Sequence, residues 1–472
     1  MAAVDLGATS GRVMLARVGP DELQVRAVHR FENLPVRTPD GLHWNILELY
    51  RQILLGLAEA LAQAPDLISV GIDSWAVDYG LVEGDALVGI PYHYRDERTA
   101  AGVEQVHARL GHDALYARNG LQFQPFNTLY QLAVEQAAGR LSGGRTVLLL
   151  PDLLGCWLTG VRLAERTNAS TTGLLDLRSG TWDTELMERL TLPPDLFPPL
   201  VDPGTVVGPL LPAVAEEVGA HHPVTVVAVG SHDTASAVVG VPMEGNAAYI
   251  SSGTWSLVGI ELDEPVLTDA SREANFTHEG GVDGRIRYLK NVMGLWLLSE
   301  SMRTWQRLGQ PAELGDLLEQ AAAVTAPVPL FDANDPSLLA PGDMPARIAA
   351  LCRAAGETPP EDPALVVRSI LESLAAAYAD AVDAAEKLSG VTIDTVHVVG
   401  GGSQNALLCQ LTADRTRRRV LAGPVEATAI GNVLVQARTA GLVSGSLEEL
   451  RGLVARTYPP VEYQPKREGP RA

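Results

Sequence analysis

Asp233 is the residue of this sequence best placed to act as a general base. It follows the apolar residues 224–229 and the short run Gly-Ser-His at 230–232, a pattern that predicts a strand leading into a helix. Ligands of α/β sheets bind at such corners, where a carboxylate can accept a proton from a hydroxyl group. Aspartate is also a preferred helix N-cap, and this segment taken alone favours the cap over catalysis.

Asp5 is a second chemical candidate. Residues 2–18 predict two strands joined by a turn of glycine and hydroxyl residues at 7–11. At the end of the first strand, the carboxylate of Asp5 could hold hydrated Mg²⁺ beside phosphates bound by the turn. The alternative is an aspartate that only accepts local backbone hydrogen bonds.

The same plan recurs at residues 247–262, with a glycine and hydroxyl turn at 251–254. This weak repeat indicates two related halves, each opening with a hairpin. Two facing hairpins could bind the β- and γ-phosphates of a nucleotide from both sides, with Arg12 supplying positive charge.

Two further segments have an open interpretation. Gly400, Gly401 and Gly402 follow an apolar segment; they let a backbone approach a ligand closely, or they simply make a tight strand-to-helix turn. The segment at 71–79 places Asp73, Trp75 and Asp78 in a strand pattern. That mixture suits a sugar, which has hydroxyl groups and an apolar face, but a solvent-facing strand edge explains it equally well.

The elements that position these residues alternate between strand and helix. Asn45 and Glu48 form a capping-box variant before a helical apolar pattern that ends near residue 63. Asp362-Pro363 begins a long amphipathic helix that ends near Gly390. The alternation predicts an α/β protein with mostly parallel mixed sheets. We expect an N-terminal domain at 1–242, a C-terminal domain at 243–458 and a poorly ordered tail at 459–472.

The composition disfavours several classes of partner. The 472 residues carry 36 Lys plus Arg and 57 Asp plus Glu, a net charge of −21, which repels nucleic acid and anionic membranes. The three lysines follow no glycine, so the GxxxxGK[ST] phosphate loop is absent. The three cysteines lie far apart, and no signal peptide or apolar span of about 20 residues is visible. We therefore expect a cytoplasmic protein without disulfides or zinc.

Several ordered blocks together resemble the FGGY family of carbohydrate kinases, from residue 2 to about residue 441. The blocks are VDLGATSGR (4–12), GIDSWAVD (71–78), PYHYRDERT (91–99), QPFNTLYQ (124–131), SHDTASA (231–237), SSGTWS (251–256), LKNVMGLW (289–296) and GPVEATAIGN (423–432). The resemblance implies two actin-like, ribonuclease H-like domains, with mixed sheets flanked by helices and a cleft between them. It also implies transfer of a phosphoryl group from MgATP to the 1-hydroxyl of L-rhamnulose.

The resemblance assigns roles to individual positions. Asp233 would be the catalytic base, and Asp5 would hold Mg²⁺. The sugar would contact Ala76, His232, Asp233, Thr234 and Asn291. The ATP would contact Ala8, Thr9, Ser10, Gly11, Arg12, Thr254, Ser299 and Gly402.

Two positions depart from the family pattern. Ala76 stands where the pattern has glycine after tryptophan, which narrows the expected sugar pocket by a methyl group. Ser299 stands where we expect a glutamine that helps to bind the nucleotide. The first departure leaves open a kinase for another ketose or polyol, such as fuculose or xylulose. An actin-like or chaperone-like ATPase is the alternative from another functional class.

Overall fold

The computed structural model describes residues 1–141, 143–310 and 312–466, and the chain forms two compact units. The first unit contains Met1–Pro242, Glu261–Tyr288 and Ala427–Thr457. The second contains Met243–Ile260, Leu289–Glu426 and the described residues from Tyr458 onward. Each unit is therefore built from segments that are distant in the sequence. In the described ranges, no helix is both long and apolar enough to cross a membrane.

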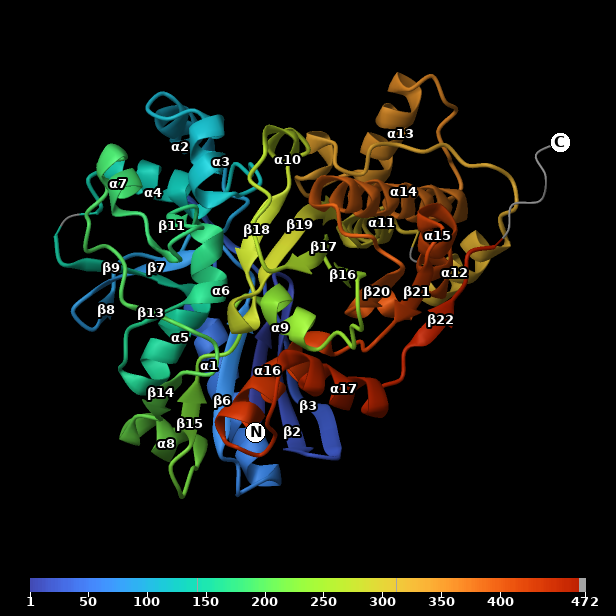
Figure 1. Cartoon of the computed structure of the whole chain (residues 1–472). Helices are drawn as coiled ribbons and strands as arrows, with labels where there is room; N and C mark the ends of the chain where they lie inside the picture. Colours follow the sequence, from blue (N-terminus) through green and yellow to red (C-terminus); the bar gives the residue numbers. More distant parts are fainter. Residues whose placement is uncertain (142, 311, 467–472) are drawn as a thin grey trace. The chain divides into compact units, whose positions relative to one another are not determined.

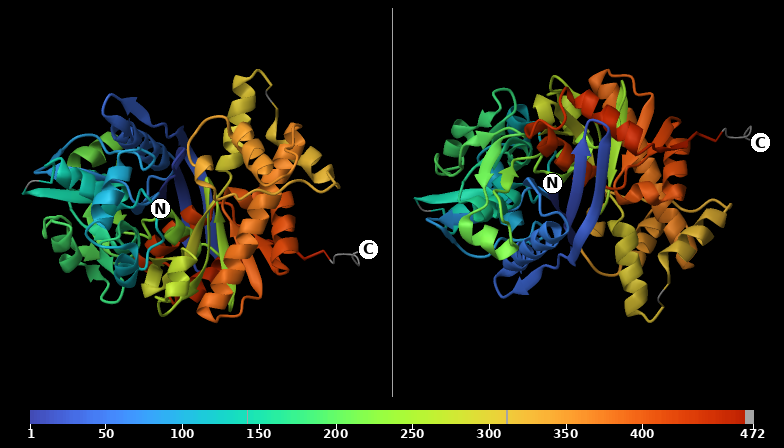
Figure 2. Two further views of the ribbon diagram at one scale, coloured as in Figure 1. Left: turned by 90° about the horizontal axis from the view of Figure 1, so that it is seen from above. Right: turned by 90° about the horizontal axis from the view of Figure 1, so that it is seen from below.

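The first unit is built on a six-stranded mixed sheet in the order β14-β15-β6-β1-β2-β3 (Figure 1). Its strands are β1 (Ala2–Leu6), β2 (Ser10–Gly19), β3 (Glu22–Glu32), β6 (Ser69–Ser74), β14 (Val206–Pro209) and β15 (Thr225–Val227). β1, β6 and β15 are parallel, whereas β1-β2-β3 form an antiparallel meander. The two long strands β2 and β3 are the pair of long blue strands in the right view of Figure 2.

Alternating side chains give this sheet two different faces. On one face, Val4 and Leu6 of β1 share a buried core with α1 (Ile46–Gln63), α5 (Leu150–Thr159) and α8 (Pro212–Val218). The other face packs against α9 (Asp233–Val239) and α16 (Ala427–Thr439), which lie side by side in Figure 1. A Cβ on Gly71 would lie 2.6 Å from Asn432 Oδ1, so glycine there lets α16 approach the sheet. The candidate residues Asp5 and Asp73 belong to this second face.

The first unit also contains a three-stranded antiparallel sheet in the order β8-β7-β9 and several short elements. The sheet consists of β7 (Tyr79–Glu83), β8 (Ala86–Leu87) and β9 (Arg145–Leu149). The short strands are β4 (Val36–Thr38), β5 (Gly41–His43), β10 (Ala164–Glu165), β11 (Leu175–Asp176), β12 (Thr181–Trp182), β13 (Leu200–Val201) and β18 (Thr277–Gly280). The remaining helices are α2 (Thr99–His107), α3 (His112–Asn119), α4 (Thr128–Ala137), α6 (Arg166–Ala169), η1 (Ser170–Thr172), α7 (Thr184–Arg189), α10 (Asp269–Glu273), η2 (Val282–Gly284) and α17 (Leu447–Thr457).

The second unit repeats the plan with strands in the order β17-β16-β20-β21-β22. They are β16 (Ala247–Ser252), β17 (Trp255–Leu262), β20 (Thr395–Val399), β21 (Arg419–Ala422) and β22 (Val461–Tyr463), and the chain changes units within β17 and within β19 (Ile286–Met293). Its helices are α11 (Trp296–Arg307), α12 (Leu314–Ala323), η3 (Pro336–Leu338), α13 (Met344–Ala354), α14 (Pro363–Ser389), η4 (Gly401–Gln404) and α15 (Ala406–Thr416). β16 and β17 form an antiparallel hairpin, and β16, β20 and β21 are parallel.

The predicted hairpins and long helices are confirmed, with differences at their ends. α14 begins after Asp362, whose side chain accepts from Ala364 N, and ends at Gly390 in the left-handed conformation. α1 also forms as predicted, but Asn45 makes no side-chain cap and the expected capping box is absent. Glu48 instead bonds to Arg51 and Gln52 one turn later.

The segment at 459–472 differs from the predicted tail. Val461–Tyr463 pairs antiparallel with β21 as β22, because an edge strand needs only a few residues with backbone donors and acceptors. Residues 467–472 of the predicted tail lie outside the described residues.

Candidate active site

Neighbouring strands of the first unit bring Asp5 and Asp73 together. In the parallel pair of β1 and β6, Asp5 stands opposite Asp73 near the carboxyl ends of both strands. Asp73 is fully buried, and its Oδ2 accepts a hydrogen bond of 2.6 Å from Asn432 Nδ2. Its Oδ1 is buried and has no hydrogen-bond partner among the described residues. Burial raises the pKa of Asp73 well above its ordinary value, and the negative charge of Asp5 adds to that effect.

Asp233 lies at the start of α9 beside these two carboxylates. The end of β6 is hydrogen-bonded to the segment before α9, with Ser74 N donating to Ser231 O at 2.9 Å. The N-cap of α9 is His232, so Asp233 is the first residue of the helix and not its cap. The N-cap role that the sequence favoured for Asp233 is therefore wrong. The helix begins at Asp233 itself, one residue earlier than a cap at this position requires.

The Oδ1 atom of the Asp233 carboxylate has two polar neighbours. Oδ1 accepts from Thr234 Oγ1 at 3.1 Å and lies 3.4 Å from His232 Nε2. About a third of the side chain, 31%, is exposed. Partial removal from water raises the pKa of Asp233, and the nearby charge of Asp5 raises it further, while His232 opposes the shift. A carboxyl group with a raised pKa is a better proton acceptor than an ordinary exposed aspartate.

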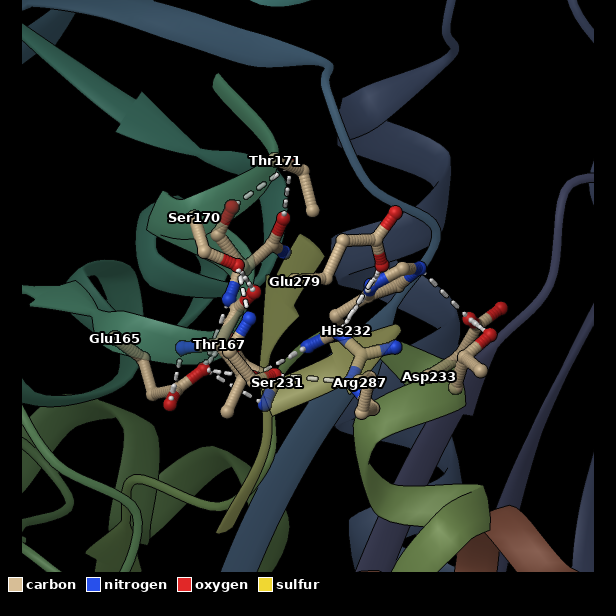
Figure 3. Close-up of polar contacts among 12 residues, drawn as sticks. Glu165, Thr167, Ser170, Thr171, Ser231, His232, Asp233, Glu279 and Arg287 are labelled. Carbon is tan, nitrogen blue, oxygen red and sulfur yellow. Dashed lines mark hydrogen bonds and ion pairs between the residues drawn. The ribbon is translucent and has the colours of Figure 1, made fainter. Parts of the chain in front are cut away.

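A buried polar cluster surrounds the chain segment that carries His232 (Figure 3). Glu165 Oε2 accepts from the backbone N–H and the hydroxyl group of Ser231, at 2.9 and 2.8 Å. Burial raises the pKa of Glu165, although bonds from Thr167 and Ser231 oppose that shift. Hydrogen bonds to the Glu165 carboxylate, and not packing alone, thus fix the backbone just before Asp233.

Charged side chains of the first unit contact the imidazole of His232. Its Nδ1 lies 3.1 Å from Arg287 Nη2 and 3.2 Å from Glu279 Oε2. Sequence reasoning missed both residues. The available signal was the pair of charges in segments that are otherwise suited to burial, but nothing in the spacing connects them with His232.

The tip of the first hairpin is partly exposed, and hydrogen bonds fix its backbone. Gly7 N donates to Ser10 O at 2.8 Å, and Asn33 Nδ2 donates to Gly7 O at 2.9 Å. Ala8 and Thr9 are partly exposed, and Ser10 is exposed. At Gly11, a Cβ would lie 2.3 Å from the ring of Phe31, so packing alone requires that glycine.

Arg12 pairs with Asp5 across the hairpin. Its Nε and Nη2 donate to Asp5 Oδ2 at 2.8 and 2.7 Å. Asp5 is therefore held by a side chain, unlike the expected alternative of an aspartate that accepts local backbone bonds. The pair leaves Arg12 a quarter exposed, at the hairpin that was predicted to bind phosphate.

The oxygen donors of Asp5 and Asp73 fit a hydrated Mg²⁺. Magnesium in phosphoryl-transfer sites takes one or two carboxylates and completes its shell with water and phosphate oxygens. Asp5 and Asp73 supply two neighbouring carboxylates, and Asp73 Oδ1 is available. Among the residues that the structure describes, no group of three or more His, Cys, Asp or Glu is arranged to hold a metal ion.

The segment after β6 is buried, so the predicted solvent-facing edge is wrong. Trp75 and Asp78 are both buried. Asp78 Oδ2 accepts from Trp44 Nε1, Trp75 Nε1 and Tyr94 N, at 2.6, 3.0 and 3.1 Å. These bonds give Asp78 a structural role, whereas Ala76 between the two is partly exposed.

The candidate nucleotide residues of the second unit lie around its hairpin turn. The carbonyl groups of Gly253 and Thr254 accept from Leu295 N and Trp296 N, which joins the turn to the start of α11. Ser299 is exposed on that helix, and Asn291 is partly exposed on β19.

The triple glycine joins β20 to η4, as predicted. A Cβ on Gly402 would lie 2.0 Å from Ser252 Oγ, and one on Gly400 would lie 2.8 Å from Ser252 O. A Cβ on Gly401 would meet nothing within 4 Å. Two of the three glycines are thus required by packing against the end of β16.

Both halves of the chain match models of one protein family. Residues 1–240 match the N-terminal domain, and residues 248–440 the C-terminal domain, of the FGGY family of carbohydrate kinases. The rhamnulokinase of Pectobacterium carotovorum subsp. carotovorum is 43% identical over 99% of this chain and 93% of its own length. The rhamnulokinase of Enterococcus faecalis is 40% identical over 98% of this chain and 93% of its own length.

Solved structures share the fold at much lower identity. Xylulose kinase from Lactobacillus acidophilus has a TM-score of 0.80 at 16% identity and covers 98% of this chain and 94% of its own. Glycerol kinase from Plasmodium falciparum, solved with ADP, has a TM-score of 0.78 at 14% identity, with the same coverage. The expected fold class of actin-like kinases with mixed sheets and flanking helices is confirmed.

Proposed function

The chain belongs to the FGGY family of carbohydrate kinases, and from this membership we propose that it phosphorylates L-rhamnulose. The reaction transfers the γ-phosphoryl group of ATP to the 1-hydroxyl of the sugar and gives L-rhamnulose 1-phosphate and ADP, in the breakdown of L-rhamnose. Similarity to rhamnulokinases over nearly the whole chain supports this substrate. Because the reaction consumes ATP, we place the protein in the cytoplasm.

The observation that carries the proposal is the carboxylate of Asp233. It is partly exposed, it has a raised pKa, and it stands beside Asp5 and Asp73 at the carboxyl ends of parallel strands. A carboxylate in such a position is suited to accept a proton from a bound hydroxyl group.

The proposed reaction is an in-line displacement. The oxygen of the 1-hydroxyl attacks the γ-phosphorus, and its proton passes to Asp233. The bond between the γ-phosphorus and the bridging oxygen breaks, and the electron pair leaves with ADP. His232, Thr234, Asn291 and Ala76 hold the sugar, so that the hydroxyl oxygen starts close to phosphorus.

The nucleotide is proposed to bind to both hairpins. Residues 8–12 and Thr254 would contact the phosphates, Gly402 would contact the rest of the nucleotide, and Ser299 would occupy the position of the family's glutamine. Mg²⁺ bound by Asp5 would neutralise phosphate charge. Arg12 adds positive charge at the first hairpin, which no lysine of that region provides.

A coupled assay for ADP tests the substrate. Purified protein is given MgATP and, in separate reactions, L-rhamnulose, L-fuculose, L-xylulose, D-xylulose or glycerol. We expect L-rhamnulose to have the highest kcat/KM. A matched preparation of the Asp233→Asn variant controls for contaminating kinases.

Three other outcomes have distinct meanings. A better ketose than L-rhamnulose overturns the substrate but keeps the kinase. This result would direct attention to the methyl group of Ala76. Release of ADP that is independent of every sugar would favour a conformational ATPase.

A further inference from the structure

Arg287 and Glu279 form a buried charged pair for which the proposed reaction has no direct use. The side chain of Arg287 has no exposed surface, and that of Glu279 is 7% exposed. Burying such a pair costs desolvation energy, and apolar residues of similar volume often give a more stable protein. Arg287 Nη1 is also buried without a hydrogen-bond partner in the described part of the chain. Stability therefore does not explain the pair.

The guanidinium group is fixed before it reaches His232. Arg287 Nε donates to Gly280 O at 2.9 Å, and Nη2 lies 3.2 Å from Glu279 Oε2. Burial would raise the pKa of Glu279, but Arg287 and His232 hold it below its ordinary value. Glu279 thus holds the arginine by charge and not by a hydrogen bond, because its buried Oε2 has no hydrogen-bond partner among the described residues.

The same Nη2 lies 3.1 Å from His232 Nδ1 (Figure 3). A guanidinium group can only donate hydrogen bonds, so a neutral imidazole beside it accepts at Nδ1 and carries its proton on Nε2. A protonated imidazole carries a proton on both nitrogens. In either state, Nε2 carries a proton, and it lies at ion-pair distance, 3.4 Å, from Asp233 Oδ1.

We propose that Arg287 and Glu279 are positioning residues that keep a proton on His232 Nε2 and thereby orient the catalytic carboxylate. His232 Nε2 and Thr234 Oγ1 both contact Oδ1 of Asp233. The other oxygen, Oδ2, is then the one that receives the proton of the substrate hydroxyl group. This inference rests on the proposed role of Asp233 as the base, whichever sugar is bound.

The first test is made without any sugar. Nitrogen-15 NMR of the imidazole of His232, assigned with a His232→Gln variant, reports which ring nitrogen carries a proton. We expect a proton on Nε2 in the wild type. In Arg287→Met, Nδ1 should donate to Glu279, and the neutral ring should lose its proton from Nε2. Arg287→Lys retains a donor and should preserve the proton on Nε2.

The second test separates orientation from folding. Arg287→Met should lower kcat about 10²-fold, the cost of a misplaced catalytic group, while KM for the sugar changes far less. Arg287→Lys should recover part of the loss. Arg451→Met is the matched control, because Arg451 is also buried, pairs with Glu261 at 2.7 Å and donates to Val238 O. It should keep kcat within about threefold.

The outcomes distinguish this inference from the substrate assignment. A wild-type His232 without a proton on Nε2 overturns it, as does Arg287→Met with unchanged kcat. Equal losses in Arg287→Met and Arg451→Met would reduce the pair to a structural role. If Arg287→Met does not fold, Glu279→Gln gives the same readouts with a smaller effect expected, and Arg287→Lys should still preserve the proton on Nε2. Absence of activity on L-rhamnulose refutes only the substrate, since the NMR measurement uses none.

Discussion

At the scale of single residues, one oxygen of each carboxylate in the site contacts neighbouring side chains. Asp233 Oδ1 faces Thr234 and His232, and Asp5 Oδ2 faces Arg12. The remaining oxygen of each carboxylate is the one assigned to chemistry. Two substitutions test these assignments.

Asp233→Asn should lower kcat roughly 10²- to 10⁴-fold, because an amide cannot accept the proton of the sugar hydroxyl group. The fold should tolerate the change, since Asp233 is not the N-cap of α9 and asparagine can still accept from Thr234. Initial rates give kcat, thermal melting reports the fold, and calorimetry reports sugar binding. A variant that keeps more than about a tenth of kcat would show that the base lies elsewhere.

Asp5→Asn should lower kcat and raise the Mg²⁺ concentration needed for half-maximal activity, because one anionic oxygen ligand is lost. Sugar affinity should change little. Magnesium titrations of the initial rate measure the effect. Asp202→Asn is the control, since Asp202 also pairs with an arginine, Arg166, but is largely exposed. An unaltered Mg²⁺ requirement would leave Asp5 as a structural partner of Arg12.

At the scale of elements, the glycines between β20 and α15 have unequal roles. Gly401→Ala should be tolerated, whereas Gly402→Ala places a Cβ 2.0 Å from Ser252 Oγ. Overpacking of this kind costs about 1–3 kcal/mol of unfolding free energy. Thermal and urea unfolding compare the two variants, and Gly402→Ala combined with Ser252→Gly should recover stability.

The double variant, Gly402→Ala with Ser252→Gly, also tests nucleotide binding. If Gly402 contacts the nucleotide, KM for ATP should rise in the double variant even after stability is restored. An ATP affinity equal to that of the wild type would indicate that packing against β16 alone requires this glycine. Gly401→Ala again serves as the matched comparison.

At the scale of the whole molecule, the buried titratable groups of the first unit set how stability depends on pH. Burial raises the pKa of five carboxyl groups, which are Asp73, Asp78, Asp152, Glu165 and Asp233. Burial raises the pKa of Asp78 to about 6, although hydrogen bonds oppose this shift; they come from Trp44, Gln131, Trp75 and Tyr94. These carboxyl groups therefore bind more protons in the folded state than in the unfolded state between about pH 4 and pH 6. Four buried or partly buried histidines whose pKa values desolvation lowers have the opposite effect, because they bind protons more readily after unfolding: His93, His107, His112 and His278.

The contribution of the five carboxyl groups to the unfolding free energy should rise as pH is lowered from 7 to 5, because unfolding releases their protons, whereas the contribution of the four histidines should fall. Asp78 alone accounts for about 1 kcal/mol of that rise. Below about pH 4 the trend should reverse, since carboxylates with lowered pKa values, such as Glu48 and Asp183, then become protonated. Urea unfolding of the ligand-free protein at several pH values measures the curve.

Asp78→Asn should remove the contribution of Asp78, so that as pH is lowered from 7 to 5 the unfolding free energy of the variant falls relative to that of the wild type, whereas the exposed Asp85→Asn should leave the pH dependence unchanged. An identical pH dependence in wild type and Asp78→Asn would show that Asp78 stays ionised in the folded state. In that case, its hydrogen bonds outweigh its burial.

Local pattern was enough to predict the elements that carry the site. Both hairpins, the long helix α14 and the strand-to-helix corner before Asp233 follow from apolar spacing, glycine turns and caps, which are properties of neighbouring residues. The first residues of the helices were predicted less accurately. Asn45 lacks its predicted cap bond, and His232 takes the cap position expected for Asp233, since caps depend on one residue's backbone angles.

The sequence by itself determined the chemistry available to this protein: a carboxylate at a corner, a carboxylate at a glycine turn, and the ordered motifs of one kinase family. Only the tertiary structure decided which groups meet. The register of β1 and β6 places Asp5 opposite Asp73, and α16 brings Asn432 to Asp73 from 359 residues away. Arg287 likewise reaches His232 across 55 residues. Periodicity tells which face of an element is buried, but contacts between distant segments are fixed by packing, which no local pattern contains.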